Sequence, residues 1–95
     1  MSSDSTRVQI GDSVIYQNLK DEIVILNMTS QIYYGLDDVG ATMWRVLLEH
    51  GSTGAAFEKL KSIYAVDEAT LRRDLEGLIQ NLAAAKLLTI SLREQ

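Results

Sequence analysis

Two short apolar segments separated by a tight turn limit the folds open to this chain. The first, EIVILNM at residues 22–28, contains four consecutive aliphatic residues, and the second, QIYYGL at residues 31–36, is rich in β-branched and aromatic residues. Both compositions favour β-strands, and only Thr29 and Ser30 lie between them. A connection this short requires antiparallel pairing, because parallel strands need a long crossover. The sequence therefore predicts a β-hairpin over residues 22–36.

A third segment of the same kind precedes the hairpin. Residues 13–19, SVIYQNL, mix β-branched and aromatic side chains, and a Lys20-Asp21 turn follows them. The three segments predict an antiparallel meander in which residues 31–36 form an edge strand. Alternation along that strand places Ile32, Tyr34 and Leu36 on one face, and Gln31, Tyr33 and Gly35 on the other.

Three amphipathic helices are predicted after the strands. Each begins at a side chain that can cap a helix: Asp37 or Asp38, Ser52 or Thr53, and Asp67. Gly51 ends the first helix, and the third is expected to reach about Lys86. Helical spacing predicts the buried residues as Val39, Met43, Val46 and Leu47, then Ala56, Phe57, Leu60, Ile63 and Tyr64, then Leu71, Leu75, Leu78, Leu82 and Ala85. Residues 88–92 alternate apolar and polar and are expected to form a short strand or an apolar tail.

The order of elements predicts the fold class. The chain has 95 residues, which fits one domain. Residues 1–12 are polar and are expected to form a flexible N-terminal tail, and residues 13–92 a single domain. Three strands followed by three helices indicate an α+β fold, a sheet covered by a helical layer. Because a tight turn joins the last two helices, we expect them to have the proportions of a helix-turn-helix.

The charge argues against nucleic acid as a partner. The net charge is −4, and the whole imbalance lies in residues 1–51, which carry three basic and seven acidic side chains. Nucleic-acid-binding domains usually carry a basic face. The alternative function, a winged-helix DNA-binding regulator, would present Thr70, Arg72, Arg73 and Gln80. The same helix carries four carboxylates, which oppose phosphate binding.

The sequence offers little for catalysis or for metal binding. It has no cysteine and one histidine, His50, and it lacks both a GxSxG motif and a Gly-rich phosphate loop. Asp37 and Asp38 are adjacent carboxylates, but at a helix start such residues usually act as caps. We therefore expect no catalytic residue, no metal and no cofactor. The polar N-terminus and the lack of an apolar run of about 20 residues predict a cytoplasmic protein without a membrane partner.

The predicted edge strand is unusual because it carries no charge. Proteins usually blunt an exposed sheet edge with charged residues or cover it. Residues 31–36 contain only uncharged side chains, including the adjacent Tyr33 and Tyr34. One interpretation is that another chain completes this edge. The other is that Tyr34 belongs to the core and Tyr33 is a half-exposed ring without a function.

Two stretches give the chain a resemblance to a known family. The segment IVILNMTSQIYYGLDDVGATMWRVLLEHG resembles the hallmark of the PqqD family, and YAVDEATLRRDLEGLIQNLAAAKLL is similar to that family's third helix. The likeness spans residues 14–88. It implies a winged-helix-like domain without catalysis, similar to pyrroloquinoline quinone synthesis protein D and the B1 proteins of lasso peptide clusters. Such a domain binds the leader segment of a ribosomally made precursor peptide and delivers it to a maturation enzyme, either a radical enzyme or a leader peptidase.

The resemblance also implies where the peptide binds. The leader would add as a strand to the third strand and lie against the third helix. Carried over by position, the strand residues are Gln31, Ile32, Tyr33, Tyr34, Gly35 and Leu36, and the helix residues are Leu71, Asp74, Leu75 and Leu78. The sequence does not fix which flank of that helix faces the peptide. The acidic balance of residues 1–51, together with Asp74, suggests a preference for leaders that carry Lys or Arg.

Overall fold

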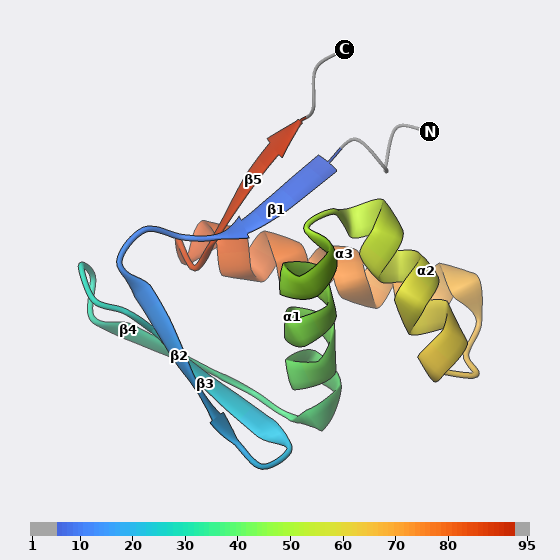
Figure 1. Cartoon of the computed structure of the whole chain (residues 1–95), viewed down its shortest axis with the longest axis horizontal. Helices are drawn as coiled ribbons and strands as arrows, with labels where there is room; N and C mark the ends of the chain where they lie inside the picture. The colour runs from blue at the N-terminus through green and yellow to red at the C-terminus, as the bar shows by residue number, and fades with distance from the viewer. Residues whose placement is uncertain (1–5, 93–95) are drawn as a thin grey trace.

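A computed structural model describes residues 6–92 of the chain (Figure 1). Five strands and three helices follow one another along the sequence. They are β1 (Thr6–Ile10), β2 (Val14–Leu19), β3 (Glu22–Asn27), β4 (Ile32–Leu36), α1 (Asp38–His50), α2 (Thr53–Ile63), α3 (Glu68–Ala84) and β5 (Leu88–Leu92). The helices lie on one side of the β2-β3-β4 sheet, and the other side faces away from them (Figure 1).

The three central strands form the predicted meander. Their order is β2-β3-β4, and both pairs are antiparallel. The register pairs Val14 with Asn27 across β2 and β3, and Asn27 with Ile32 across β3 and β4. The α+β class, with an antiparallel three-stranded sheet followed by three helices, is confirmed.

The N-terminal segment differs from the expected tail. Residues 6–10 form β1, which pairs antiparallel with β5 in a separate two-stranded ribbon. Val8 is buried, and its N–H donates to the carbonyl oxygen of Gly51 at 3.0 Å. The segment is ordered because β5 and the α1–α2 turn satisfy its backbone groups. Residues 1–5 of the expected tail lie outside the described residues.

The predicted starts of the three helices and the predicted end of α1 are confirmed by their capping contacts. Asp37 Oδ1 accepts from Gly40 N at 2.9 Å, Ser52 Oγ from Ala55 N at 3.2 Å, and Asp67 Oδ2 from Thr70 N at 3.1 Å. Gly51 has a φ of 73°, a left-handed conformation that suits glycine at a helix end. α3 stops at Ala84, two residues before the predicted end. Lys86 itself has a φ of 63° and belongs to the following turn.

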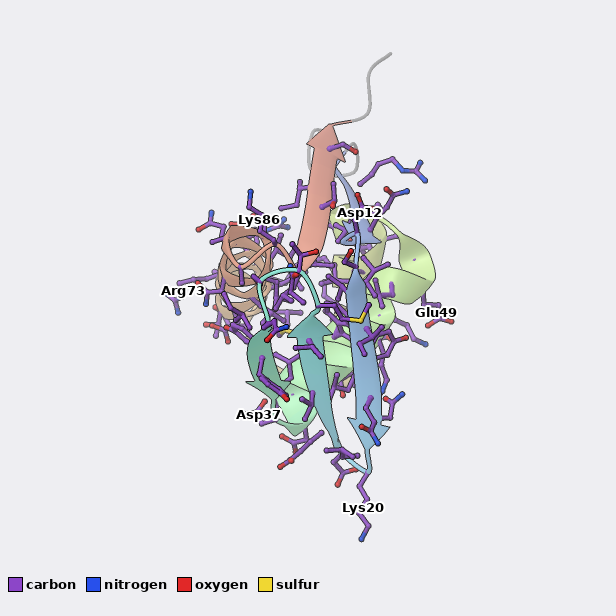
Figure 2. All side chains as sticks on the ribbon, turned by 90° about the vertical axis from the view of Figure 1, so that its left-hand side faces the viewer. Asp12, Lys20, Asp37, Glu49, Arg73 and Lys86 are labelled. Carbon is purple, nitrogen blue, oxygen red and sulfur yellow. The ribbon has the colours of Figure 1, made fainter. Side chains whose placement is uncertain are left out.

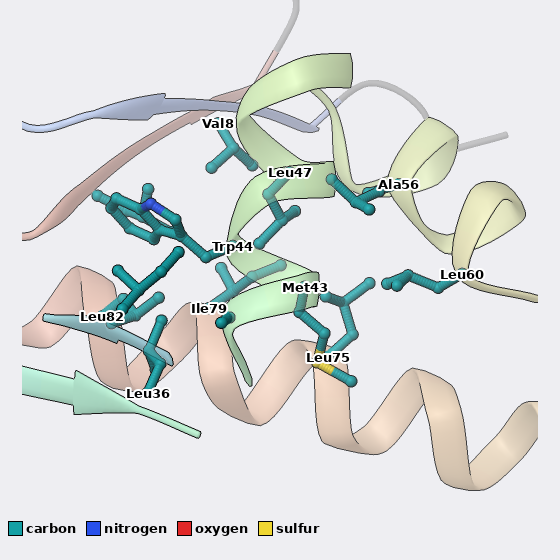
Figure 3. Close-up of a cluster of buried hydrophobic side chains, with 14 of the residues drawn as sticks. Val8, Leu36, Met43, Trp44, Leu47, Ala56, Leu60, Leu75, Ile79 and Leu82 are labelled. Atoms are coloured by element: carbon teal, nitrogen blue, oxygen red, sulfur yellow. The ribbon is translucent and has the colours of Figure 1, made fainter. Parts of the chain in front are cut away.

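Trp44 of α1 anchors the core between the sheet and α3 (Figure 3). Its indole is fully buried, and the Tyr16 ring from β2 meets it edge-on at a centroid distance of 5.4 Å. Two predicted core residues are instead exposed, Val39 at 43% and Ile63 at 46%. They lie in the first turn of α1 and at the last residue of α2, where the helices extend beyond the core. Ile79, which is buried, extends the α3 stripe that holds Leu75 and Leu82.

Candidate functional site

β4 is an edge strand whose outward backbone groups can be identified from the register. Within a strand, the residues whose N–H and C=O face one neighbour alternate with those that face the other. Met28 N donates to Ser13 O at 2.8 Å, so the even-numbered residues of β3 face β2 and the odd-numbered ones face β4. The β4 partners of the odd-numbered residues are Ile32, Tyr34 and Leu36. The backbone groups of Tyr33 and Gly35 therefore point away from the sheet.

The side chains of β4 become more buried along the strand. Ile32, at its start, is 47% exposed although it lies on the face that turns toward the helices. Tyr34 is half-buried and Leu36 is buried, and Figure 3 shows Leu36 near Leu82 of α3. The helices thus cover the end of β4 but leave its beginning accessible. Tyr33, on the opposite face, is 71% exposed.

The outer face of the sheet is also largely apolar. Figure 2 looks onto this face, with α3 seen end-on beside β4. A shallow depression on it is lined by Ile15, Tyr16, Gln17, Val24, Leu26 and Tyr33. Tyr33 therefore joins two surfaces, because its backbone lies on the open edge and its ring lies on the outer face.

The contacts of Arg72 show which flank of α3 turns toward α2. Its guanidinium lies 4.2 Å from the centroid of the Phe57 ring of α2. Successive helix residues are about 100° apart, so the opposite flank of α3 carries Asp74, Leu78, Asn81 and Ala85. Leu78 and Ala85 on this flank are half-buried against the core, and Asp74 and Asn81 are exposed.

Only part of the predicted helix wall is accessible. Leu71 and Leu75 are 3% and 2% exposed, so both belong to the core and offer almost no surface to a ligand. They were expected at the site because the family resemblance, carried over by position, placed them there. Asp74 and Leu78 lie on the accessible flank. Asn81, seven residues after Asp74, was absent from the predicted site, although this spacing of two helical turns places it on the same side.

The acidic residues near this edge act mainly as caps. Asp37 caps α1, and Asp38 Oδ1 accepts from Val39 N at 2.8 Å. Within residues 6–92 no group of three or more His, Cys, Asp or Glu side chains is arranged to hold a metal ion. No helix in the described part of the chain is long and apolar enough to cross a membrane.

Fold and site together define a small winged-helix-like domain in which the uncharged edge strand β4 lies beside the third helix. The chain belongs to the PqqD family, described as Coenzyme PQQ synthesis protein D, which matches residues 22–88. Among solved structures, it is similar to "TbiB1 in Complex with the TbiA(beta) Leader Peptide". The identity is 34%, the coverage is 84% of this chain and 93% of that chain, and the TM-score is 0.79.

A second solved structure supports the fold alone. It is "Lasso peptide synthetase B1 complexed with the leader peptide", which is 22% identical and has a TM-score of 0.77. The coverage is 87% of this chain and 98% of that chain. A comparison with curated protein sequences finds no match.

Proposed function

We propose that this chain binds the leader segment of a ribosomally made precursor peptide by strand addition to β4. In this role it presents the peptide to the enzyme that modifies or cleaves it, and it catalyses no step itself. The observation that carries the proposal is the open edge of β4, where Tyr33 and Gly35 direct their backbone groups outward. The similarity to TbiB1, which was solved with a leader peptide, supports the same assignment.

Backbone pairing alone does not account for a useful affinity. Tyr33 and Gly35 offer two donors and two acceptors, which together contribute about 4 kcal/mol at a typical net value per hydrogen bond. A micromolar complex requires about 8 kcal/mol, and ordering a disordered leader adds to the cost. Side-chain contacts must supply the difference. Ile32 and Tyr34 on the strand and Leu78 on α3 offer apolar surface for them.

The exposed carboxylate of Asp74 suggests which leaders bind best. Asp74 lies on the α3 flank opposite α2, and no basic side chain of α3 shares that flank. A leader with Lys or Arg opposite this position gains a favourable contact, and that gain falls as salt increases. Backbone pairing tolerates many sequences, so side chains of this kind would provide the specificity.

The experiment is a titration of ¹⁵N-labelled protein with leader segments of precursor peptides encoded near its gene, followed through amide chemical shifts. We expect the largest shifts at residues 31–36 and on the Asp74–Asn81 flank of α3. A reversed-sequence peptide of the same composition is the control. Shifts confined to β2, the other edge of the sheet, would reject the proposed site. A response to duplex DNA centred on Arg73, without a response to any leader, would reject the function.

A further inference from the structure

We propose that Asn27 is a positioning residue of the peptide site, because it holds the β4 edge at a set distance from α3. This inference rests on the proposed function and adds to it a residue that never touches the peptide. Asn27 is a polar side chain in the core, at 4% exposure. Such a residue is retained in a core only when its polar atoms are hydrogen-bonded.

The oxygens of Asn27 organise the turn that begins β4. Its Oδ1 accepts from Thr29 N at 2.9 Å and from Ser30 N at 3.1 Å. Its carbonyl oxygen accepts from Gln31 N at 2.7 Å. Gln31 has a φ of 62°, so the chain reverses there and enters β4 in a fixed direction. Asn27 thus determines where the open edge starts.

The amide nitrogen of the same side chain reaches the end of α3. Nδ2 donates to the carbonyl oxygen of Lys86 at 3.1 Å, across 59 positions of sequence. Lys86 lies in the turn that joins α3 to β5 and has a φ of 63°. A single side chain therefore connects the start of β4 to the C-terminal end of the helix that forms the other side of the proposed site.

Gly11 confines the same carbonyl group from another direction. Its N–H donates to Leu87 O at 3.0 Å, and a Cβ atom at position 11 would lie 2.7 Å from Lys86 O. That distance is shorter than van der Waals contact, so only glycine fits without displacing the turn. Asn27 and Gly11 together fix the position of the α3–β5 turn relative to the sheet.

This connection matters because α3 otherwise meets the sheet through apolar side chains of the shared core, which do not fix its position by hydrogen bonds. α1 packs on β3 and β4, whereas α3 packs mainly on α2 and β5. An added strand must lie about 4.8 Å from β4, and its hydrogen bonds weaken once the donor–acceptor distance exceeds about 3.2 Å. A shift of α3 by a fraction of that spacing would force the peptide to lose contact with either the strand or the helix.

Two substitutions disturb the same carbonyl from different sides. Asn27→Asp keeps the acceptors for the β3–β4 turn but removes the donor to Lys86 O. Gly11→Ala leaves Asn27 intact and displaces Lys86 O by steric contact, and it keeps the inference testable if Asn27→Asp does not fold. Ile25→Val is the matched control, because it truncates a fully buried side chain on β3 without touching the connection.

The first readout is the distance between the sheet and α3, measured without peptide. The chain has no native cysteine, so spin labels at the exposed Gln17 and Gln80 report one distance by pulsed electron spin resonance. We expect both test variants to shift or broaden this distribution, and Ile25→Val to leave it unchanged. A role of Asn27 in stability alone would not move it.

The second readout is leader affinity. We expect both test variants to weaken binding about fivefold or more, the equivalent of one lost hydrogen bond, with the control within about twofold of the original chain. An unchanged label distance in the test variants overturns the inference, and so does a shifted distance with unchanged affinity. If the original chain binds no leader, the proposed function fails, and the role of Asn27 in peptide binding fails with it. The label distance still reports separately whether Asn27 positions α3.

Discussion

Proline scanning of β4 tests the assigned direction of each backbone group. The register directs the Tyr33 N–H outward and the Tyr34 N–H toward β3. Proline removes the donor and fixes φ, so it is tolerated on an edge strand only where the N–H faces outward. Tyr33→Pro should therefore leave the fold intact and weaken leader binding, whereas Tyr34→Pro should damage the fold.

The size of each effect follows from burial and bonding. Tyr33 is 71% exposed and its N–H makes no bond to β3, so Tyr33→Pro should cost about 1 kcal/mol or less of stability. It removes one of four backbone groups offered to the peptide, which predicts at least about fivefold weaker binding. Tyr34→Pro breaks a ladder bond and removes a half-buried ring, and it should cost about 3 kcal/mol or more. That is a large share of the stability of a small domain.

Both effects can be measured on the same samples. Trp44 is the single tryptophan and is fully buried, so its fluorescence reports unfolding in urea. Leader affinity is measured by calorimetry, with Tyr33→Ala as the control that removes the ring but keeps the amide. If Tyr33→Pro unfolds the protein, or if Tyr34→Pro leaves stability unchanged, the assigned directions are wrong. If Tyr33→Ala loses as much affinity as Tyr33→Pro, the ring and not the amide binds the peptide.

Three further results are expected. Asp74→Asn should weaken binding of a Lys- or Arg-bearing leader by about two- to fivefold at low salt and by less at high salt; equal affinity at every salt concentration would remove the charge hypothesis. Leu82→Ala, at a fully buried site, should lower the free energy of unfolding by about 2–5 kcal/mol in urea titrations, and a loss below 1 kcal/mol would mean that the core repacks around the truncated side chain. The hydrogen bond from Lys61 to Glu68, with the nearby Glu58 carboxylate, raises the pKa of Lys61 above its ordinary value of 10.5. The stability that this interaction contributes is complete below the pKa that Lys61 has in the unfolded chain, and it is lost as the pH rises through the pKa of Lys61 in the folded protein. An NMR titration should show the pKa of Lys61 falling in Glu68→Gln, and an unchanged pKa would contradict that cause.

The central strands and the helix ends could be predicted because their signals are local. Alternation, short turns and capping side chains all act within a few residues, and Asp37, Ser52 and Asp67 cap the helices as expected. The strand β1 was missed because its partner β5 lies at the far end of the chain. The sequence around Val8 has no strand pattern that can be recognised by itself, and only tertiary contacts give its backbone a hydrogen-bond partner.

The edge strand β4 shows the same limit in finer detail. The uncharged strand was recognised, but whether Tyr33 or Tyr34 faces outward depends on the register across a loop that ends with Gln31 in a left-handed conformation. Periodicity correctly identified Leu71 as part of the buried stripe of α3, whereas the family resemblance, carried over by position, placed it at the site. The accessible flank is determined by the packing of Arg72 on Phe57, a contact between two helices that spacing within one helix does not reveal.

That packing also bears on the DNA-binding alternative. A recognition helix needs free cations on its exposed side, because duplex affinity depends on neutralising phosphates. In α3 the guanidinium of Arg72 is held over the Phe57 ring, and the exposed Arg73 is followed directly by Asp74. The carboxylate of Asp74, which opposes phosphate binding, lies on the flank of α3 that faces away from α2. This charge arrangement on α3 fits the proposed peptide site, which includes Asp74, better than it fits the DNA-binding alternative.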